Sequence, residues 1–396
     1  MTKENMATAD NAAHSQRISV PFSYPVHFTR GVFDADNPLL AKVLDRAADT
    51  APKTLVYLDS GLVEAHPHLP DSVVEYANRH RGVIRTAQPP RTLPGGETAK
   101  DGWGTALEVV EDIGKLQLCR HSFVVAAGGG ALLDAVGFAA ALVHRGVRLV
   151  RLPSTTLSQD DSGVGVKNGI NQGEVKNFIG TFAPPFAVIN DFSFLRTLPH
   201  DVMLDGIAEA FKVAIVKDAA FFDFLCDSAE RIARAEPAAI EEAVRRSALL
   251  HLDHIRAGND PFEFGVSRPL DFGHWSAHRL EGLSKYSVRH GQAVAVGIAL
   301  DTYYSWRNGL ISRDEMTRIL DAFNRTGLPL YHTLLSRRDK DKRLLILEGL
   351  AQFREHLGGR LSITLPRGIG SRIEVHEMDT AVIEEGIGFL ADNWGS

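Results

Sequence analysis

Cysteine is almost absent from this sequence, which holds only Cys119 and Cys226 among its 396 residues. Two cysteines cannot supply the disulfide framework of a small secreted domain, and reduced thiols are typical of the cytoplasm. We therefore expect a cytoplasmic protein that is stabilised by a hydrophobic core. Apolar residues make up 44% of the chain, which is enough to build such a core.

Long apolar runs and an excess of basic charge are lacking as well. No segment approaches the roughly 18 to 20 apolar residues that cross a bilayer, and the polar N-terminus lacks the apolar region of a signal peptide. The 43 basic and 49 acidic side chains leave a net charge of −6. This composition argues against a nucleic-acid partner and against a membrane partner.

The chain is long enough for two domains, and its pattern changes near residues 192–200. Residues 1–19 are polar and are interpreted as a disordered tail. Residues 20–196 alternate β-branched runs with helical stretches, which predicts an α/β domain with a parallel sheet. The expected strands cover residues 54–59, 82–87, 122–127, 147–153 and 186–191, and the helices between them include 104–118 and 132–144.

Residues 197–396 show helical periodicity instead and predict a mostly helical second domain. The expected helices cover residues 205–216, 238–257, 274–283, 290–306, 313–326 and 343–356, and a short strand is expected at 360–366. A cleft between two such domains is the default position of a ligand site.

A glycine-rich turn, Gly128-Gly129-Gly130, joins an expected strand to an expected helix. Glycine lets backbone N–H groups approach a phosphate closely, and a helix N-terminus favours an anion. The motif is not the G-x-G-x-x-G of the common dinucleotide fingerprint, so a tight turn without a ligand stays an alternative.

Two polar segments accompany this turn. Residues 93–97 (LPGGE) carry a turn signal and are followed by Lys100, and Glu97 is a candidate to bind a ribose hydroxyl. Residues 158–180 combine acids, lysines, asparagines and glycines. We expect them to form an irregular loop that binds an anionic, hydroxylated ligand, with a solvated surface loop as the alternative.

Glu209, His274 and His290 form a third candidate set. Lys212 lies one helical turn after Glu209, and His278 shares a helical face with His274. A carboxylate and two imidazoles are a ligand set for a catalytic Zn²⁺-type ion with open positions for a substrate. The chain has 16 histidines and no H-E-x-x-H motif, so the alternative of structural histidines stays open.

Taken in order, these motifs resemble those of the 3-dehydroquinate synthase-like sugar phosphate cyclases. The resemblance runs from about residue 59 to about residue 370, and it includes GGG at 128–130, PSTTLSQDD at 153–161, KN at 176–177, G.AE..K at 206–212, FGH at 272–274 and HG.AV at 290–294. It implies a parallel-sheet NAD-binding domain followed by a helical metal-binding domain. It also implies Zn²⁺ (or Co²⁺) and a homodimer in which Arg145 reaches the neighbouring subunit's phosphate site.

The resemblance further assigns roles to individual residues. The NAD-binding residues would be Asp59, Glu97, Lys100, Gly129, Gly130, Asp134, Ser154, Thr155 and Lys176. The metal ligands would be Glu209, His274 and His290. The catalytic residues would be Asp161, Lys167, Lys212, Glu263 and His278. The residues that bind the sugar phosphate would be Arg145, Lys167, Asn177, Arg268, Asp271 and His278. The family's C-terminal phosphate-binding lysine has no clear match, and either Arg354 or His356 would take its place.

The sequence departs from the family where a substrate carboxylate would bind. A family arginine falls at Ser267, with an arginine displaced to Arg268, and a family lysine falls at Asp253. A family asparagine is replaced by Asp271. A carboxylate would lose two charge-assisted bonds, at roughly 1.5 to 3 kcal/mol each, and would be repelled by two aspartates. We therefore expect a substrate without that carboxylate.

The carboxylate-free relative of that substrate is sedoheptulose 7-phosphate, and the segments GNDPFEFG (258–265), PLDFGHWSAH (269–278) and FREHLGG (353–359) resemble the cyclases that use it. The implied carbon–oxygen lyase reaction is transient oxidation by NAD, β-elimination of phosphate, re-reduction and intramolecular aldol closure. The product would be 2-epi-valiolone or 2-epi-5-epi-valiolone. Three alternatives stay open: a 3-dehydroquinate synthase, a metal- and NAD-dependent polyol dehydrogenase, and a catalytically idle scaffold relative.

Overall fold

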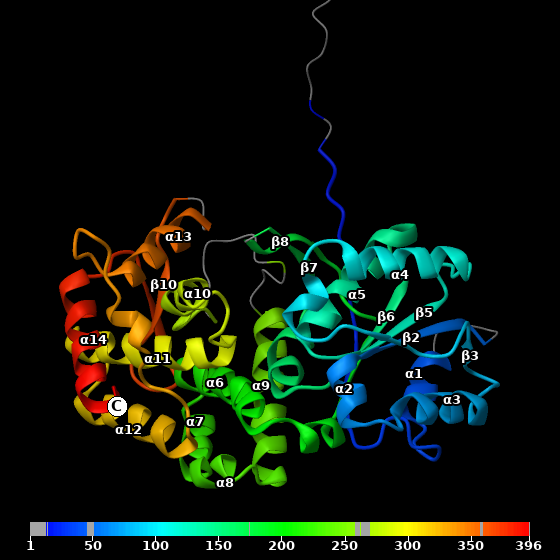
Figure 1. The fold of residues 1–396 in the computed structure, drawn as a ribbon, viewed down its shortest axis with the longest axis horizontal. Coiled ribbons are helices and arrows are strands. Elements are labelled where there is room, and N and C mark those ends of the chain that lie inside the picture. The colour runs from blue at the N-terminus through cyan, green and yellow to red at the C-terminus, as the bar shows by residue number, and fades with distance from the viewer. Residues whose placement is uncertain are drawn as a thin grey trace, which may run out of the picture.

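The structure is a computed structural model that describes residues 13, 15–45, 51–173, 175–257, 262, 270–356 and 359–395. A parallel sheet with its covering helices forms one half of the molecule, and a helical assembly forms the other half (Figure 1). Most of the expected N-terminal tail lies outside the described residues. Within the described residues, every helix is too short or too polar to cross a membrane.

A seven-stranded parallel sheet has the order β1-β9-β6-β5-β2-β3, and β4 also pairs with β2. Its strands are β1 (Val26–Thr29), β2 (Lys53–Asp59), β3 (Arg85–Thr86), β4 (Arg91–Leu93), β5 (Phe123–Gly128), β6 (Arg148–Pro153) and β9 (Ala187–Asp191). The central strands are buried on both faces, which explains their continuous apolar runs. The parallel sheet predicted from the sequence is confirmed.

The strand predicted at residues 82–87 is too long, since only Arg85 and Thr86 form a strand, β3. They pair with Lys53 and Thr54 at the start of β2. The later positions of β2 on the same side, residues 57–59, pair with β4 instead.

Helices cover both faces of the sheet. They are α1 (Leu39–Asp45), α2 (Ser60–Ala65), α3 (Leu69–Arg79), α4 (Gly104–Lys115) and α5 (Gly130–Leu142). Successive residues of β2 enter different cores, because side chains alternate along a strand. Val56 packs in the core that contains α1 and α3, and Leu55 packs in the core that contains α4 and α5.

The helical half follows the sheet along the chain. Its helices are α6 (His200–Lys217), α7 (Ala219–Asp227), α8 (Ala229–Ala233), α9 (Pro237–Ala257), α10 (His274–Leu283), α11 (His290–Arg307), α12 (Arg313–Thr326), α13 (Glu348–His356) and α14 (Thr380–Trp394), with a hairpin of β10 (Ile363–Pro366) and β11 (Arg372–Val375). The helix predicted at 343–356 is shorter, because a 3-10 turn occupies Leu345–Leu347. Cys119 and Cys226 are free thiols, as expected.

The described residues of the segment 158–180 form regular elements, so the expectation of an irregular loop is wrong. A π-helical turn covers Ser158–Ser162, and an antiparallel hairpin joins β7 (Lys167–Gln172) to β8 (Val175–Phe182). The fully buried Arg151 donates hydrogen bonds to the carbonyls of Gly165 (3.0 Å) and Lys167 (2.7 Å) and to Asn168 Oδ1 (2.6 Å). Arg151 therefore fixes the entry to the hairpin from outside the segment.

Candidate functional site

The order of the strands changes direction where β2 and β5 are neighbours, and the carboxyl edge of the sheet at this point is a candidate ligand site. The chain leaves β2 toward β3 and β4 on one side and returns to β5 on the other side. Such a topological switch point opens a crevice in which ligands bind. Asp59 ends β2 and Gly128 ends β5, so both lie at this crevice.

Side chains pack closely against glycines at and beside the Gly128–Gly130 turn. A Cβ at Gly95 would lie 2.1 Å from Asp59 Oδ1, and a Cβ at Gly130 would lie 2.5 Å from Ser162 Oγ. The Gly129 N–H lies 3.4 Å from Asp59 Oδ2. The first N–H groups of α5 have no partner within the helix, so the turn fits the anionic part of a nucleotide cofactor.

Ser154 and Thr155 follow β6, directly beside this turn. The Ser154 N–H donates to the Gly128 carbonyl (2.9 Å). The Thr155 hydroxyl donates to Ser158 Oγ (2.9 Å). Residues predicted to bind the cofactor thus gather at the ends of β2, β5 and β6.

A polar cluster extends from the crevice toward the hairpin. Lys100 Nζ donates to Asp134 Oδ2 (3.1 Å) and to Asn177 Oδ1 (2.9 Å). Asn171 donates to Glu97 Oε1 (2.9 Å) and accepts from the Asn177 N–H (2.9 Å). Burial lowers the pKa of Lys100, but Asp134 and Glu97 outweigh burial and raise it. The cluster therefore holds a charged lysine beside carboxylate and amide oxygens, which are acceptors for the hydroxyl groups of a ligand.

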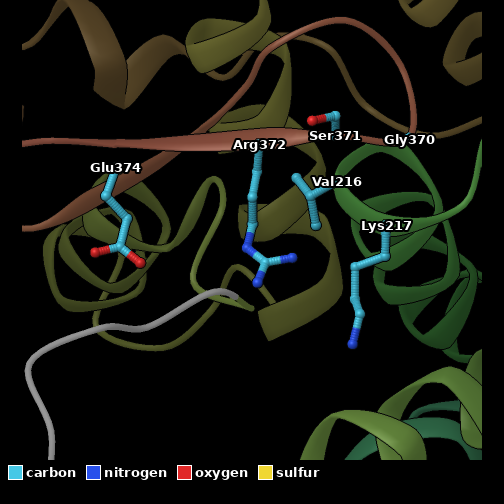
Figure 2. Close-up of a pocket in the computed structure, with 6 residues that line it drawn as sticks. All are labelled: Val216, Lys217, Gly370, Ser371, Arg372 and Glu374. Atoms are coloured by element: carbon cyan, nitrogen blue, oxygen red, sulfur yellow. The ribbon is translucent and has the colours of Figure 1, made fainter. Parts of the chain in front are cut away.

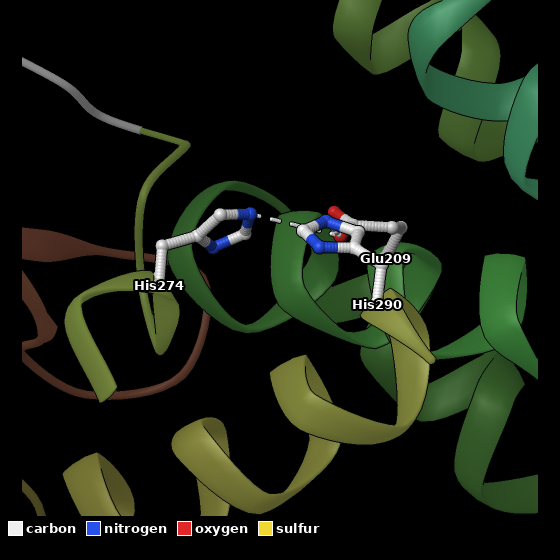
Figure 3. A group of neighbouring side chains, drawn as sticks. All are labelled: Glu209, His274 and His290. Atoms are coloured by element: carbon white, nitrogen blue, oxygen red, sulfur yellow. Dashed lines mark ion pairs between the residues drawn. The ribbon is translucent and has the colours of Figure 1, made fainter. Parts of the chain in front are cut away.

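Three candidate metal ligands, Glu209, His274 and His290, lie between the helices of the second half and are called the metal-type set. Glu209 is in the middle of α6, while His274 and His290 are the first residues of α10 and α11. Glu209 Oε1 lies 3.4 Å from His290 Nε2 and 3.8 Å from His274 Nε2. One ligand atom from each residue lies within 4.8 Å of the others, and Figure 3 shows both rings turned toward the carboxylate.

The donor set fits a divalent cation. Both Glu209 oxygens are buried and lack an aligned hydrogen-bond donor in the described part of the chain, although Lys212 ion-pairs with Oε2. A buried carboxylate oxygen without a hydrogen bond is costly unless a cation compensates it. A carboxylate and two imidazoles are ligands that Zn²⁺ accepts.

The charges around this set follow from burial and from close neighbours. Burial raises the pKa of Glu209, but Lys212 and His290 outweigh it and hold the pKa at about 2. Burial and the Lys212 charge lower the pKa of His274 well below its usual value. Burial lowers the pKa of His290, but Glu209 and Glu281 raise it to about 10.

Other predicted residues surround the metal-type set. The His278 ring centroid lies 5.4 Å from that of His274 and 6.0 Å from that of His290. Asp271 precedes α10. Burial lowers the pKa of Lys212, but Glu209 and Asp161, with a smaller effect of Asp271, outweigh burial and raise it. Lys167 begins β7, where it is exposed.

Arg145 lies apart from both clusters, on an exposed turn after α5. His144 and Arg145 both have left-handed backbone angles, with φ of 55° and 60°. Two successive non-glycine residues in this conformation are costly. Glu263 and Arg268 lie outside the described residues, as does the side chain of His356.

His251 and Glu281 are site residues that the sequence analysis missed. His251 Nδ1 lies 3.0 Å from Asp161 Oδ1. Burial raises the pKa of Asp161, but the His251 charge outweighs it and lowers the pKa to about 2. His251 carries no motif signal, whereas Glu281 lies one turn after His278 and continues an H-x-x-x-H-x-x-E spacing on one helix face.

A separate cavity of about 380 Å³ lies between the end of α6 and β11. Figure 2 shows Lys217 and Arg372 extending into the same space. Burial and the charge of Arg372 lower the pKa of Lys217. None of the residues predicted for the functional site lines this cavity, whose lining consists of Val216, Lys217, Gly370, Ser371, Arg372 and Glu374.

Comparison with sequence families matches two profiles in succession. The profile of the 3-dehydroquinate synthase N-terminal domain matches residues 91–205, and that of the C-terminal domain matches residues 206–345. A 3-dehydroquinate synthase of Xylella fastidiosa (strain M12) is 31% identical over 96% of this chain and 99% of its own length. Another, of Ruegeria sp. (strain TM1040), is 38% identical over 70% of this chain and 74% of its own length.

Comparison with solved structures finds an enzyme with a different name, whose sequence identity to this chain is similar to that of the relatives above. The 2-epi-5-epi-valiolone synthase of Streptomyces hygroscopicus subsp. jinggangensis 5008, solved with NAD⁺ and Zn²⁺ bound, matches with a TM-score of 0.83. The match has 30% identity and covers 96% of this chain and 100% of that protein.

Proposed function

This chain belongs to the 3-dehydroquinate synthase family of sugar phosphate cyclases, and from that premise we propose that it converts sedoheptulose 7-phosphate into a valiolone-type C7 cyclitol and phosphate. The observation that carries the proposal is the presence of aspartates at two positions where the family has an amide and a lysine for the substrate carboxylate. Asp271 acts electrostatically on Lys212, and Asp253 lies on α9, where it is exposed and ion-pairs with Arg256 (2.9 Å). The similarity to a 2-epi-5-epi-valiolone synthase supports the same substrate.

We assign NAD to the α/β domain, residues 20–196, and Zn²⁺ (or Co²⁺) to the helical domain, residues 197–396. The solved relative binds NAD⁺ and Zn²⁺. The crevice residues Asp59, Gly129, Gly130, Ser154 and Thr155, with the cluster of Glu97, Lys100, Asp134 and Lys176, would hold NAD. Glu209, His274 and His290 would hold the metal. Bound NAD supplies reversible hydride acceptance, and the bound metal supplies Lewis acidity toward sugar hydroxyls.

The protein's own residues would orient the sugar and stabilise the leaving phosphate. Lys212 compensates the Glu209 charge in a buried environment, where an unpaired carboxylate would be strongly destabilising. Lys167, Asn177 and His278 would bind phosphate by charge and hydrogen bonds. The phosphate can serve as its own base in the elimination, so no dedicated protein base is required.

Arg145 would complete the phosphate site of a neighbouring subunit, which makes the active enzyme a homodimer. Its exposed position and the left-handed backbone at His144 and Arg145 support this assignment, because strained backbone is retained where it has a use.

The experiment is a substrate comparison. The pure protein, with NAD⁺ and Zn²⁺, is given sedoheptulose 7-phosphate or the carboxylated heptulosonate phosphate in parallel. Free phosphate is measured, and the product is identified by NMR. We expect phosphate from sedoheptulose 7-phosphate, and the NMR spectrum then names the epimer. Phosphate from the carboxylated substrate alone would overturn the proposal.

A second candidate function is 3-dehydroquinate synthase itself. It is favoured by the names of the relatives at 31% and 38% identity. It requires cations at the substrate carboxylate, and two of the family's positions for them hold Asp253 and Ser267. The same experiment separates the two functions.

A further inference from the structure

Both carboxylate oxygens of Glu281 contact residues of the candidate site. It lies in α10 and is 4% exposed. Its Oε2 lies 3.3 Å from His290 Nδ1, and its Oε1 lies 3.0 Å from Lys176 Nζ. The other ring nitrogen of His290, Nε2, faces Glu209 Oε1 at 3.4 Å. The His290 ring is therefore held between two buried carboxylates.

A second metal ion is one interpretation of this geometry, because ligand atoms of His278, Glu281 and His290 also lie within 4.8 Å of one another. Two contacts argue against it. The Lys176 ammonium already compensates the Glu281 charge, and a cation there would repel Lys176. His290 Nδ1 would also have to give up its hydrogen bond to Glu281.

Lys176 is itself held in place, so Glu281 has a fixed partner. Its Nζ lies 4.4 Å from the centroid of the Tyr286 ring and 3.8 Å from Glu97 Oε1. A buried carboxylate with a fixed cation on one oxygen presents its other oxygen in a defined direction.

We propose that Glu281 is a positioning residue that accepts the Nδ1–H of His290 and thereby directs the Nε2 lone pair at the metal. This proposal depends on one part of the proposed function, namely that Glu209, His274 and His290 bind a metal ion. A hydrogen bond at one ring nitrogen selects the tautomer and sets the orientation of a metal-binding histidine. Outer residues of this kind contribute 10- to 100-fold to metal affinity.

The test measures Zn²⁺ affinity by competition with a chromogenic chelator, without NAD or substrate. The proteins compared are the unchanged chain, Glu281→Ala, Glu281→Gln and the control Glu348→Gln. Glu348 of α13 ion-pairs with Arg279 of α10, the helix that carries Glu281, so its loss perturbs α10 without touching His290. We expect Zn²⁺ affinity to fall 10- to 100-fold in Glu281→Ala. We expect a fall of about fivefold in Glu281→Gln, whose amide oxygen is a weaker acceptor, and no change in the control.

The visible spectrum of the Co²⁺-loaded proteins gives a second readout. It reports the geometry of the ligands, which a merely structural role would leave unchanged, so we expect Glu281→Ala to shift the absorption bands. Unchanged Zn²⁺ affinity in Glu281→Gln overturns the proposal, even if the alanine variant does not fold. Equal losses in Glu281→Ala and Glu348→Gln also overturn it.

The outcomes separate this inference from the proposed function. Zn²⁺ binding without phosphate release from sedoheptulose 7-phosphate would refute the substrate and leave the role of Glu281 intact. Failure of the unchanged protein to bind Zn²⁺ or Co²⁺ would refute the metal site and the role of Glu281 together.

Discussion

The backbone of Gly291 lies so close to that of Asp205 that a Cβ at position 291 would be 2.3 Å from the Asp205 Cα. Gly291 follows His290 in α11, and Asp205 is one turn before Glu209 in α6. This contact sets the distance between the two helices and thereby brings His290 within reach of Glu209.

Gly291→Ala should separate α6 from α11. We expect overpacking to cost about 1–3 kcal/mol of stability, because the clash is with backbone. We also expect Zn²⁺ affinity to fall, since His290 moves away from Glu209. The matched control is Gly282→Ala in α10, where a Cβ meets no atom within 4 Å. The control should keep or slightly raise the unfolding temperature and keep Zn²⁺ affinity. Equal behaviour of the two variants would contradict the role of this contact.

Metal removal should lower the stability of the protein. Zn²⁺ at 100 times its Kd would stabilise the folded state by about 2.7 kcal/mol, measured as a rise in unfolding temperature over the chelator-treated protein. His274→Asn should abolish that rise. The pKa of His274 lies well below its usual value, so replacing this neutral ring removes a ligand without leaving a charge unpaired. A Zn²⁺-dependent rise that persists in His274→Asn would place the metal elsewhere.

Restoring the missing cations should shift substrate preference. We expect the double variant Asp253→Lys and Ser267→Arg to raise kcat/KM for the carboxylated heptulosonate phosphate relative to sedoheptulose 7-phosphate. Each restored charge-assisted bond is worth roughly 1.5 to 3 kcal/mol, or about tenfold or more. The control Asp253→Asn removes charge without adding a cation and should change the ratio less. An unchanged ratio in the double variant would show that these positions do not determine specificity.

Asp301 should make stability depend on pH. It accepts hydrogen bonds from Trp275 Nε1 (2.8 Å) and from the Gly273 N–H (3.1 Å), which flank His274. Burial raises the pKa of Asp301 to about 7, against the effect of these two bonds. The folded state therefore holds a proton that the unfolded state releases above about pH 4. The stabilisation that comes from protonated Asp301 is fully present below about pH 4 and is lost as the pH rises through 7.

Asp301→Asn cannot titrate, so the comparison isolates this group. We compare the free energy of unfolding of the unchanged protein with that of Asp301→Asn. The difference in favour of the unchanged protein should be larger at pH 5 than at pH 8, by an amount on the order of 2 to 3 kcal/mol. Unfolding temperatures of the two proteins at both pH values test this. A difference that is the same at pH 5 and pH 8 would show that Asp301 is ionised throughout.

Much of the architecture could be predicted from residue patterns. Strands β5 and β9 contain continuous apolar runs, which predicted buried parallel strands, and both strands are buried along their length. Strands β1 and β4 were not predicted, because they have four and three residues and only partial burial. Helical periodicity placed Glu209 beside Lys212 and His274 beside His278, because those pairs lie on one turn.

Contacts between distant segments could not be predicted. Arg151 organises a hairpin that begins sixteen residues later at Lys167, and His251 on α9 pairs with Asp161 ninety residues earlier. Neither pair follows a periodic spacing, because packing of the whole chain brings them together. Segment order within the family predicted which residues belong to the metal-type set, but only the structure shows how Gly291 and Glu281 arrange them.

The most direct test of the central claim is the ratio of NADH accumulated to phosphate released. The protein is given sedoheptulose 7-phosphate and excess NAD⁺, and absorbance at the NADH band is followed with free phosphate. A cyclase re-reduces its own intermediate, so we predict many phosphates per subunit and no net NADH. One NADH per turnover would identify a polyol dehydrogenase and contradict the account.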